Sequence, residues 1–166
     1  MTLSRFTPSR RWLLTGLLAA ATTASYAAAP DATAADQTDT TAHQHRAACV
    51  AALTSKAEPL VARMKGGDHR IEAELLGLTE SGFALIGAAY RDGRRKPEAD
   101  QLLDAAKKAQ KAMPSAELAK LQSNCQSEGR QVLAEANMLE RYLVTSAAKK
   151  RISRIAERAS KTTEAR

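Results

Sequence analysis

Apolar residues recur at helical spacing through most of the chain, and this pattern decides the fold class. In the clearest example the intervals alternate between three and four residues, at Val50, Leu53, Ala57, Leu60 and Met64. Such spacing places the side chains along one side of an α-helix, whereas a strand would alternate every second residue. Similar stripes run through residues 69–91, 97–113 and 115–145. We therefore predict an all-α fold.

Glycine and proline divide these stripes into four helices. The interruptions are Gly66-Gly67, Asp92-Gly93 and Pro114-Ser115. Asp68 is placed to cap the second helix, and Pro97 suits the first turn of the third. Short turns between helices predict an antiparallel four-helix bundle with up-down-up-down topology and a long C-terminal helix. We assign this bundle to residues 42–146, after a flexible tether at residues 28–41 that has no apolar periodicity.

The first 27 residues have the composition of an export signal. Three arginines and no acid precede an apolar stretch over residues 12–21, which is too short to span a bilayer. Small residues at Ser25 and Ala27 favour cleavage after Ala27. The pair Arg10-Arg11 leaves a twin-arginine signal open beside an ordinary secretory signal. Either signal predicts a periplasmic or secreted protein.

Two cysteines remain after removal of this signal, Cys49 and Cys125. A rise of about 1.5 Å per residue brings them to nearly the same level in the predicted bundle. Because exported proteins meet an oxidising environment, we predict that they form a disulfide. Two free buried thiols are the alternative.

The fourth apolar stripe continues beyond residue 131, where the bundle is expected to end. Its last members are Val132, Leu133, Ala136, Leu139 and Leu143. An apolar stripe of this length is rarely left in water, so we predict that these residues form an interface. A homodimer, a partner protein, or a fold-back through a break at Gly129-Arg130 would each cover them.

Positive charge is concentrated near the C-terminus. The chain has a net charge of +7, and residues 141–166 hold eight basic and two acidic residues. The main group is Lys149, Lys150, Arg151, Arg154 and Arg158. With Ile152 and Ile155, residues 147–166 would form a weakly amphipathic basic tail that binds an anionic membrane surface, or else a solvated helix end. No aromatic residues interleave with these charges, so a nucleic-acid partner is not expected.

Residues 80–113 resemble a single tetratricopeptide unit. The resemblance is carried by Phe83, Ile86, Gly87, Tyr90, Ala99, Leu103 and Ala106, around a turn at Asp92-Gly93. These spacings are similar to the large and small positions of that family, and they cover about a quarter of the mature chain. The resemblance implies two helices that cross closely at Gly87 and Ala99, and protein or peptide binding. An ordinary helical hairpin with small residues at its crossing remains the alternative.

Catalytic and metal-binding patterns are weak. His43 and His45 lie two residues apart, so on a helix they point in different directions, and we expect both to be exposed to solvent. The chain has no Cys-x-x-Cys-His motif for covalent haem and no Gly-x-Ser-x-Gly motif for a nucleophilic serine. We predict no catalytic residue, no metal ligand and no cofactor.

Together these observations predict an exported, non-enzymatic helical protein. Its expected role is to bind another protein, or a second copy of itself, in the cell envelope, as an inhibitor, an immunity-type protein or an adaptor. The alternative is an envelope-surface protein that uses its cationic tail on anionic lipid or polymer.

Overall fold

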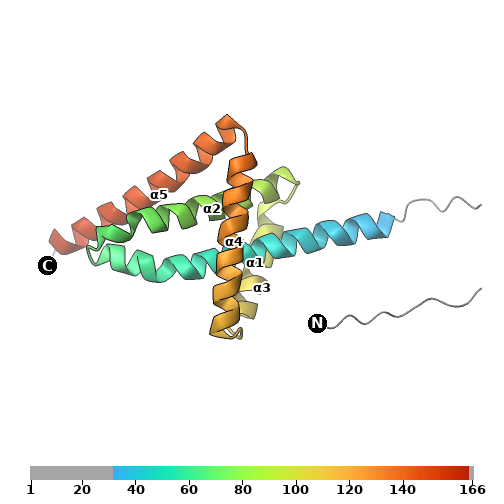
Figure 1. Ribbon diagram of the computed structural model, residues 1–166, viewed down its shortest axis with the longest axis horizontal. Coiled ribbons are helices and arrows are strands. Elements are labelled where there is room, and N and C mark those ends of the chain that lie inside the picture. Colours follow the sequence, from blue (N-terminus) through green and yellow to red (C-terminus); the bar gives the residue numbers. More distant parts are fainter. Residues whose placement is uncertain (1–31, 165–166) are drawn as a thin grey trace, which may run out of the picture. The chain divides into compact units, whose positions relative to one another are not determined.

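The protein folds into five helices that pack against one another (Figure 1). The computed structural model describes the backbone of residues 32–164 and the side chains of residues 40–158. The helices are α1 (Ala32–Lys65), α2 (Glu72–Arg91), α3 (Lys96–Gln110), α4 (Ser115–Glu135) and α5 (Met138–Glu164), with a short 3-10 turn η1 (His69–Ile71) before α2. No strand occurs in this part of the chain, so the all-α prediction is confirmed. None of the described helices is long and apolar enough to cross a membrane.

The N-terminal predictions fall partly outside the described residues. The export signal at residues 1–27 and the first part of the tether, residues 28–31, are not described. The rest of the predicted tether, residues 32–41, is helical, because α1 already begins at Ala32. Alanine and threonine there continue the helix without contributing an apolar stripe, which explains why periodicity did not reveal it.

The turn between α1 and α2 follows the prediction. Gly67 has a φ of 90°, a left-handed conformation that suits glycine. The Asp68 carboxylate accepts a hydrogen bond from the backbone N–H of Arg70 and so caps the following turn. The guanidinium groups of Arg63 and Arg70 lower the pKa of Asp68 to about 2.

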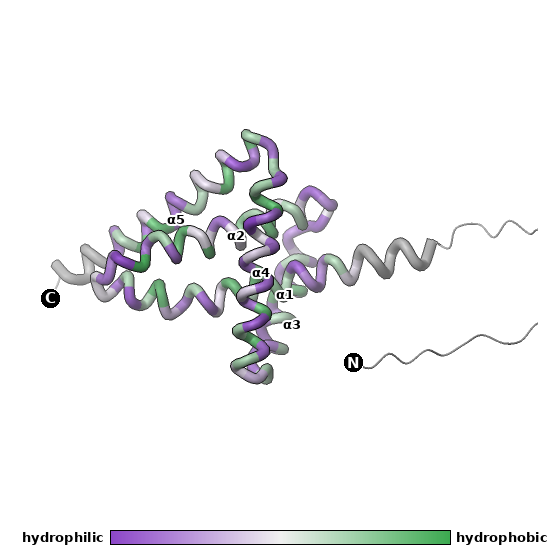
Figure 2. The backbone as a smooth tube through the Cα atoms, in the orientation of Figure 1, coloured by the Kyte–Doolittle hydropathy of each residue, from purple (hydrophilic) through white to green (hydrophobic). Residues whose placement is uncertain are grey.

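The buried sides of α1 and α2 form the centre of the core. Its largest members from these helices and η1 are Leu53, Leu60, Met64, Ile71, Leu75, Leu78 and Leu85. They belong to the two predicted stripes, so the periodicity identified the right sides of both helices. Figure 2 shows hydrophobic residues alternating with hydrophilic ones along the helices, as expected where one side is buried.

Helix α4 runs across α1 and α2 (Figure 1), whereas the predicted up-down-up-down bundle would place it alongside them. The crossing with α2 is very close at Gly129. A β-carbon added there would lie 2.6 Å from the backbone oxygen of Ser81. Glycine is therefore required for the close approach of the two helices, and Gly129 is not the site of a helix break.

The predicted long fourth helix is instead two helices. It breaks at Ala136, whose backbone is extended, and Asn137 then begins the return. The Asn137 side chain accepts a hydrogen bond from the Glu140 N–H at 2.9 Å, and the Glu140 carboxylate accepts one from the Asn137 N–H at 3.3 Å. This reciprocal pair is a capping box that starts α5.

Helix α5 folds back onto α2 and α1. Ala148 is fully buried and Ile152 is 2% exposed, and Ile152 belongs to the core. The boundary expected at residue 146 therefore falls inside a continuous helix, and the described part of the predicted basic tail is packed on the rest of the protein. The chain thus follows the fold-back arrangement, with its break at Ala136-Asn137 and not at Gly129-Arg130.

Helices α2 and α3 do not form the close hairpin that the tetratricopeptide resemblance implies. Helix α3 packs on α1, and a pocket separates its first turns from α2. Gly87 is exposed, and a β-carbon there would meet no atom within 4 Å. Its small size therefore serves no helix crossing within the described structure.

Candidate functional site

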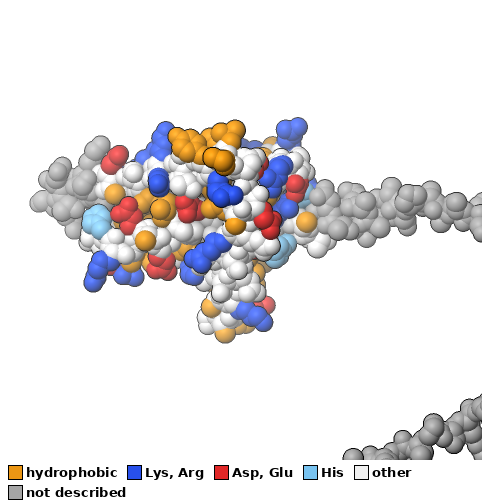
Figure 3. All heavy atoms as spheres, turned by 45° about the horizontal axis from the view of Figure 1, so that its top comes forward, with side chains coloured by type: hydrophobic (Ala, Val, Ile, Leu, Met, Phe, Trp, Pro, Cys, Tyr) orange, Lys and Arg blue, Asp and Glu red, His pale blue; other side chains and the backbone are white. Residues whose placement is uncertain are grey.

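The first two turns of α5 expose four large apolar side chains. Met138 is 87% exposed, Leu139 67%, Tyr142 69% and Leu143 56%. We call these four residues the apolar face. Figure 3 shows hydrophobic side chains gathered on this side of the molecule. Ala148 and Ile152, on another side of the same helix, are buried in the core. The apolar face is therefore separate from the surface through which α5 packs on the rest of the protein.

The predicted interface residues are divided between two environments. Leu139 and Leu143 lie on the apolar face, whereas Val132, Leu133 and Ala136 are half-buried. Those three line a groove of about 240 Å³ between α2, α4 and the start of α5, and Leu143 lines it as well. The break at Ala136 changes the direction of the chain, so that Leu143 still lines this groove whereas Leu139 does not.

Met138 and Tyr142 were not among the predicted interface residues. They lie four residues apart, directly beside the pair Leu139 and Leu143, so the four residues form a compact block on a helix. Once a new helix is taken to begin after Asn137, the four residues fall on one side of it, because the register of this helix differs from that of α4.

The five basic residues of α5 from Lys149 to Arg158 are exposed, and most of them share the outward side of the helix with the apolar face. At about 100° per residue, Lys149, Lys150 and Arg154 follow the direction of Tyr142 and Leu143. Arg151 and Arg158 lie farther round the helix, and both are exposed. Ile152 is buried, so the apolar side expected to enter a membrane is occupied by the protein's own core.

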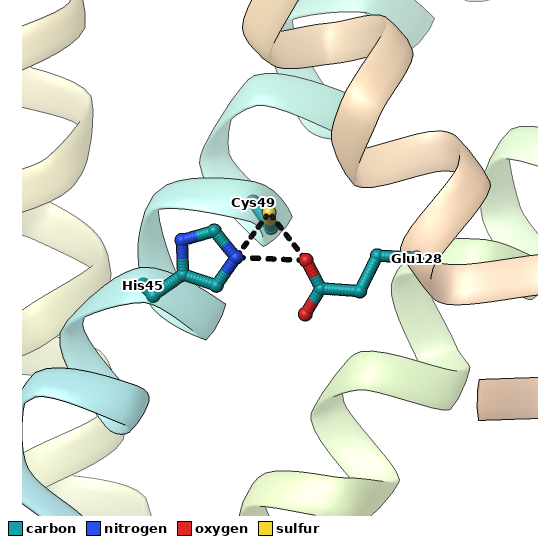
Figure 4. A group of neighbouring side chains, drawn as sticks. All are labelled: His45, Cys49 and Glu128. Carbon is teal, nitrogen blue, oxygen red and sulfur yellow. Dashed lines mark hydrogen bonds and ion pairs between the residues drawn. The ribbon is translucent and has the colours of Figure 1, made fainter. Parts of the chain in front are cut away.

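A disulfide joins α1 to α4 through Cys49 and Cys125, as predicted. Both cysteines are fully buried. His45 precedes Cys49 by one helical turn and Glu128 follows Cys125 by one turn, and their side chains meet beside the disulfide (Figure 4). His45 Nε2 lies 2.7 Å from Glu128 Oε2, and each atom lies 3.7 Å from the Cys49 sulfur.

The cluster places the His45–Glu128 pair beside a disulfide, which is a redox-active group. A disulfide sulfur carries no hydrogen and no thiolate charge, so neither 3.7 Å approach is a thiol hydrogen bond. The His45 side chain is 54% exposed and the Glu128 side chain 35%, so they form the solvent side of an otherwise buried disulfide. Glu128 is 83 residues from His45 in the chain, so no local sequence pattern connects the two side chains.

His43 is buried, with 2% of its surface exposed, which corrects the expectation that it faces solvent. It lines an apolar pocket of about 120 Å³ between α1, α2 and α3. The physical reason is the longer α1, which continues past the turn between α2 and α3 and brings His43 against it. The pocket is well below the roughly 300 Å³ at which small-molecule sites begin, and its size suits an anchoring side chain better.

Comparison of the chain with protein-family models, with curated proteins and with solved structures finds no match in any of the three. The function must therefore be inferred from the chain's own residues. Among the surfaces described above, the apolar face is the one whose exposure the fold itself does not explain.

Proposed function

We propose that this chain is an exported, non-enzymatic helical protein that binds another protein in the cell envelope through its apolar face. The observation that carries the proposal is the exposure of Met138, Leu139, Tyr142 and Leu143 on two consecutive turns of one helix. Contiguous exposed apolar side chains mark interaction sites in folded proteins. Tyrosine and methionine are also enriched at protein interfaces.

The charges around the apolar face indicate the kind of partner. Lys149, Lys150 and Arg154 extend the same outward side of α5. At the other end, Arg141 is held by the backbone oxygens of Ala134 and Ala136, at 3.0 and 2.9 Å. A partner with an apolar depression and acidic residues beside it would be complementary in both shape and charge.

The predicted export signal and the disulfide both support an envelope location. Residues 1–27 would direct the chain out of the cytoplasm, to the periplasm or the exterior, where a disulfide persists. Inhibitor, immunity-type and adaptor proteins all act by covering a surface of another protein. A second copy of this chain is the other occupant to consider, since a homodimer would cover the apolar face on both copies.

The experiment compares proteins captured from an envelope extract by the exported chain and by two variants. Leu139→Asp places a charge in the centre of the apolar face, and Ser123→Asp places the same charge on an exposed position of α4. We expect the wild type and Ser123→Asp to capture the same protein and Leu139→Asp to lose it. Equal capture by all three chains would contradict the proposal. Light scattering on the purified chains identifies a homodimer, which Leu139→Asp should convert to a monomer.

The alternative function is an envelope-surface protein that binds anionic lipid or polymer through the basic residues of α5. The observation that favours it is the exposure of all five basic residues from Lys149 to Arg158. Vesicles with and without anionic lipid provide the test. Binding through these charges should fall steeply as the salt concentration rises, whereas binding through the apolar face should change little.

A further inference from the structure

Three side chains that commonly bind zinc, those of His45, Cys49 and Glu128, meet where α1 and α4 cross, and Cys125 is bonded to one of them. His45 and Cys49 lie four residues apart on α1, and Cys125 and Glu128 lie three residues apart on α4. Each interval places the two side chains on the same side of their helix. Figure 4 shows His45, Cys49 and Glu128 pointing toward one another from the two helices, and the disulfide adds Cys125 to the group.

Two of the three distances among His45, Cys49 and Glu128 match those of a metal site, and the third, 2.7 Å between His45 Nε2 and Glu128 Oε2, would lengthen by about 0.6 Å around an ion. The ligand atoms of His45, Cys49 and Glu128 all lie within 4.8 Å of one another. Zinc is held by imidazole nitrogen, thiolate sulfur and carboxylate oxygen at about 2.0–2.3 Å, so neighbouring ligands of a tetrahedral site lie roughly 3.3–3.8 Å apart. The 3.7 Å separations from the Cys49 sulfur to the histidine and to the carboxylate fall in that range.

The disulfide prevents metal binding in the described state. Its two sulfurs are bonded to each other and carry no thiolate charge, which a zinc-class cation requires. We propose that the dithiol form of this chain binds one divalent, zinc-class cation through His45, Cys49, Cys125 and Glu128. Formation of the Cys49–Cys125 disulfide then releases the cation.

Metal binding and disulfide formation use the same two sulfur atoms, those of Cys49 and Cys125. When the dithiol form binds the cation, the two thiols lose their protons and two metal–sulfur bonds form. On oxidation, the two thiolates give two electrons to an oxidant of the disulfide class. The Cys49–Cys125 bond forms, both metal–sulfur bonds break, the cation leaves, and the oxidant's disulfide is converted to two thiols with the uptake of two protons. A dithiol reductant reverses the exchange.

The surroundings allow this change without moving the helices apart. The Cα atoms of Cys49 and Cys125 are 5.0 Å apart. Rotation of the two cysteine side chains can therefore separate the sulfurs to the roughly 3.8 Å of a tetrahedral site. His45 and Glu128 are partly exposed, so they can move outward around the ion and leave it a path from solvent. The same two helices are then joined in both redox states.

The test uses cobalt(II) as a spectroscopic probe for zinc on the full exported chain. The chain is reduced with a phosphine, separated from the reductant, and titrated with cobalt. We expect thiolate-to-cobalt charge-transfer bands and tetrahedral ligand-field bands that saturate at one equivalent, and displacement of the cobalt by zinc. The oxidised chain should give none of these bands. A reduced chain without them, whether folded or unfolded by circular dichroism, overturns the proposal.

Two pairs of variants test the ligand set. His45→Ala and Glu128→Gln should each weaken cobalt binding on the order of tenfold or more. The matched controls His69→Ala and Glu117→Gln change the same residue types at exposed positions elsewhere and should leave the affinity unchanged. Equal affinity in all four variants would show binding by the cysteines alone and would overturn the four-ligand site.

Release on oxidation is measured separately. A small-molecule disulfide is added to the zinc-loaded reduced chain, and the free zinc is followed with a chromogenic chelator. We expect one equivalent of zinc to appear as the thiols disappear. Zinc that stays bound after the thiols are consumed would overturn the redox-controlled release. None of these results depends on the apolar face, so the site can fail or succeed independently of the proposed function.

Discussion

The crossing of α4 with α2 and the start of α5 lie about ten residues apart in the chain, and they use apolar surface in opposite ways. At the crossing, Cys125 is fully buried and Gly129 lies against the Ser81 backbone, so the fold uses all of this surface. At the start of α5, Leu139 and Tyr142 are more than half exposed although the helix is well packed on its other side. Apolar residues with similar spacing therefore serve the fold in the first region and remain available for a partner in the second.

The largest expected effect of a single substitution separates the two sides of α5. Ile152→Ala removes a buried side chain from the core and should lower the free energy of unfolding by about 3 kcal/mol. Leu139→Ala removes a mostly exposed side chain and should change it by less than about 0.5 kcal/mol. Urea unfolding followed by circular dichroism measures both. Equal losses of stability in the two variants would show that the apolar face also stabilises the fold, which would contradict the distinction between the two regions.

The burial of Ala148 and Ile152 also predicts that the C-terminal segment stabilises the fold. A chain that ends after Thr145 loses Ala148 and Ile152 from the core, so it should be clearly less stable than the full chain. Thermal unfolding measures the loss. An unchanged melting temperature of the truncated chain would show that residues 147–166 do not stabilise the fold and form a separate tail.

A smaller effect tests the crossing of α4 and α2. Gly129→Ala places a β-carbon against the backbone of Ser81, so the helices must shift, and we expect a loss of about 2 kcal/mol. The matched change Gly82→Ala meets no atom within 4 Å inside α2 and should stabilise the helix by roughly 0.5–1 kcal/mol. We therefore predict that the two substitutions change the free energy of unfolding in opposite directions. A stabilising Gly129→Ala would mean that α4 does not cross α2 as closely as described.

The smallest effect concerns the turn between α1 and α2, outside both regions. Arg63 and Arg70 lower the pKa of Asp68 to about 2, below its ordinary value of 3.8. A lowered pKa stabilises the fold above pH 4, and this contribution is lost as the pH falls from about 4 to 2. Asp68→Asn should therefore lose less stability over this interval than the wild type, as measured by melting temperature. The exposed Asp104→Asn serves as the control.

Local patterns predicted the parts of the fold that local physics decides. The stripes through Leu53 and Leu75 identified the buried sides of α1 and α2. The pairing of Cys49 with Cys125 is confirmed, but the count of helical rise that supported it assumed a bundle in which α4 runs alongside α1, whereas α4 crosses α1. The break at Ala136 contains neither glycine nor proline, so the search for those residues passed over it. Its signal was the pair Asn137 and Glu140, three residues apart, which forms the capping box of α5.

Contacts between distant residues could not be predicted in the same way. A break at Gly129-Arg130 was one of three alternatives for the fourth stripe, and the close contact that explains Gly129 involves Ser81, 48 residues away in the chain. His45 and Glu128 are brought together by the disulfide and by the direction in which α4 crosses α1. Neither direction nor crossing angle is encoded in the spacing of apolar residues along one helix.

Oxidative footprinting can test directly whether another molecule covers the apolar face in the envelope, as we propose. Hydroxyl radicals oxidise exposed methionine and tyrosine, so Met138 and Tyr142 should react readily in the dilute purified chain. In intact envelopes their oxidation should fall several-fold, whereas that of Tyr90, on α2, should stay the same. Equal oxidation of Met138 and Tyr142 in the two settings would show that the apolar face is uncovered where the protein works and would contradict the account.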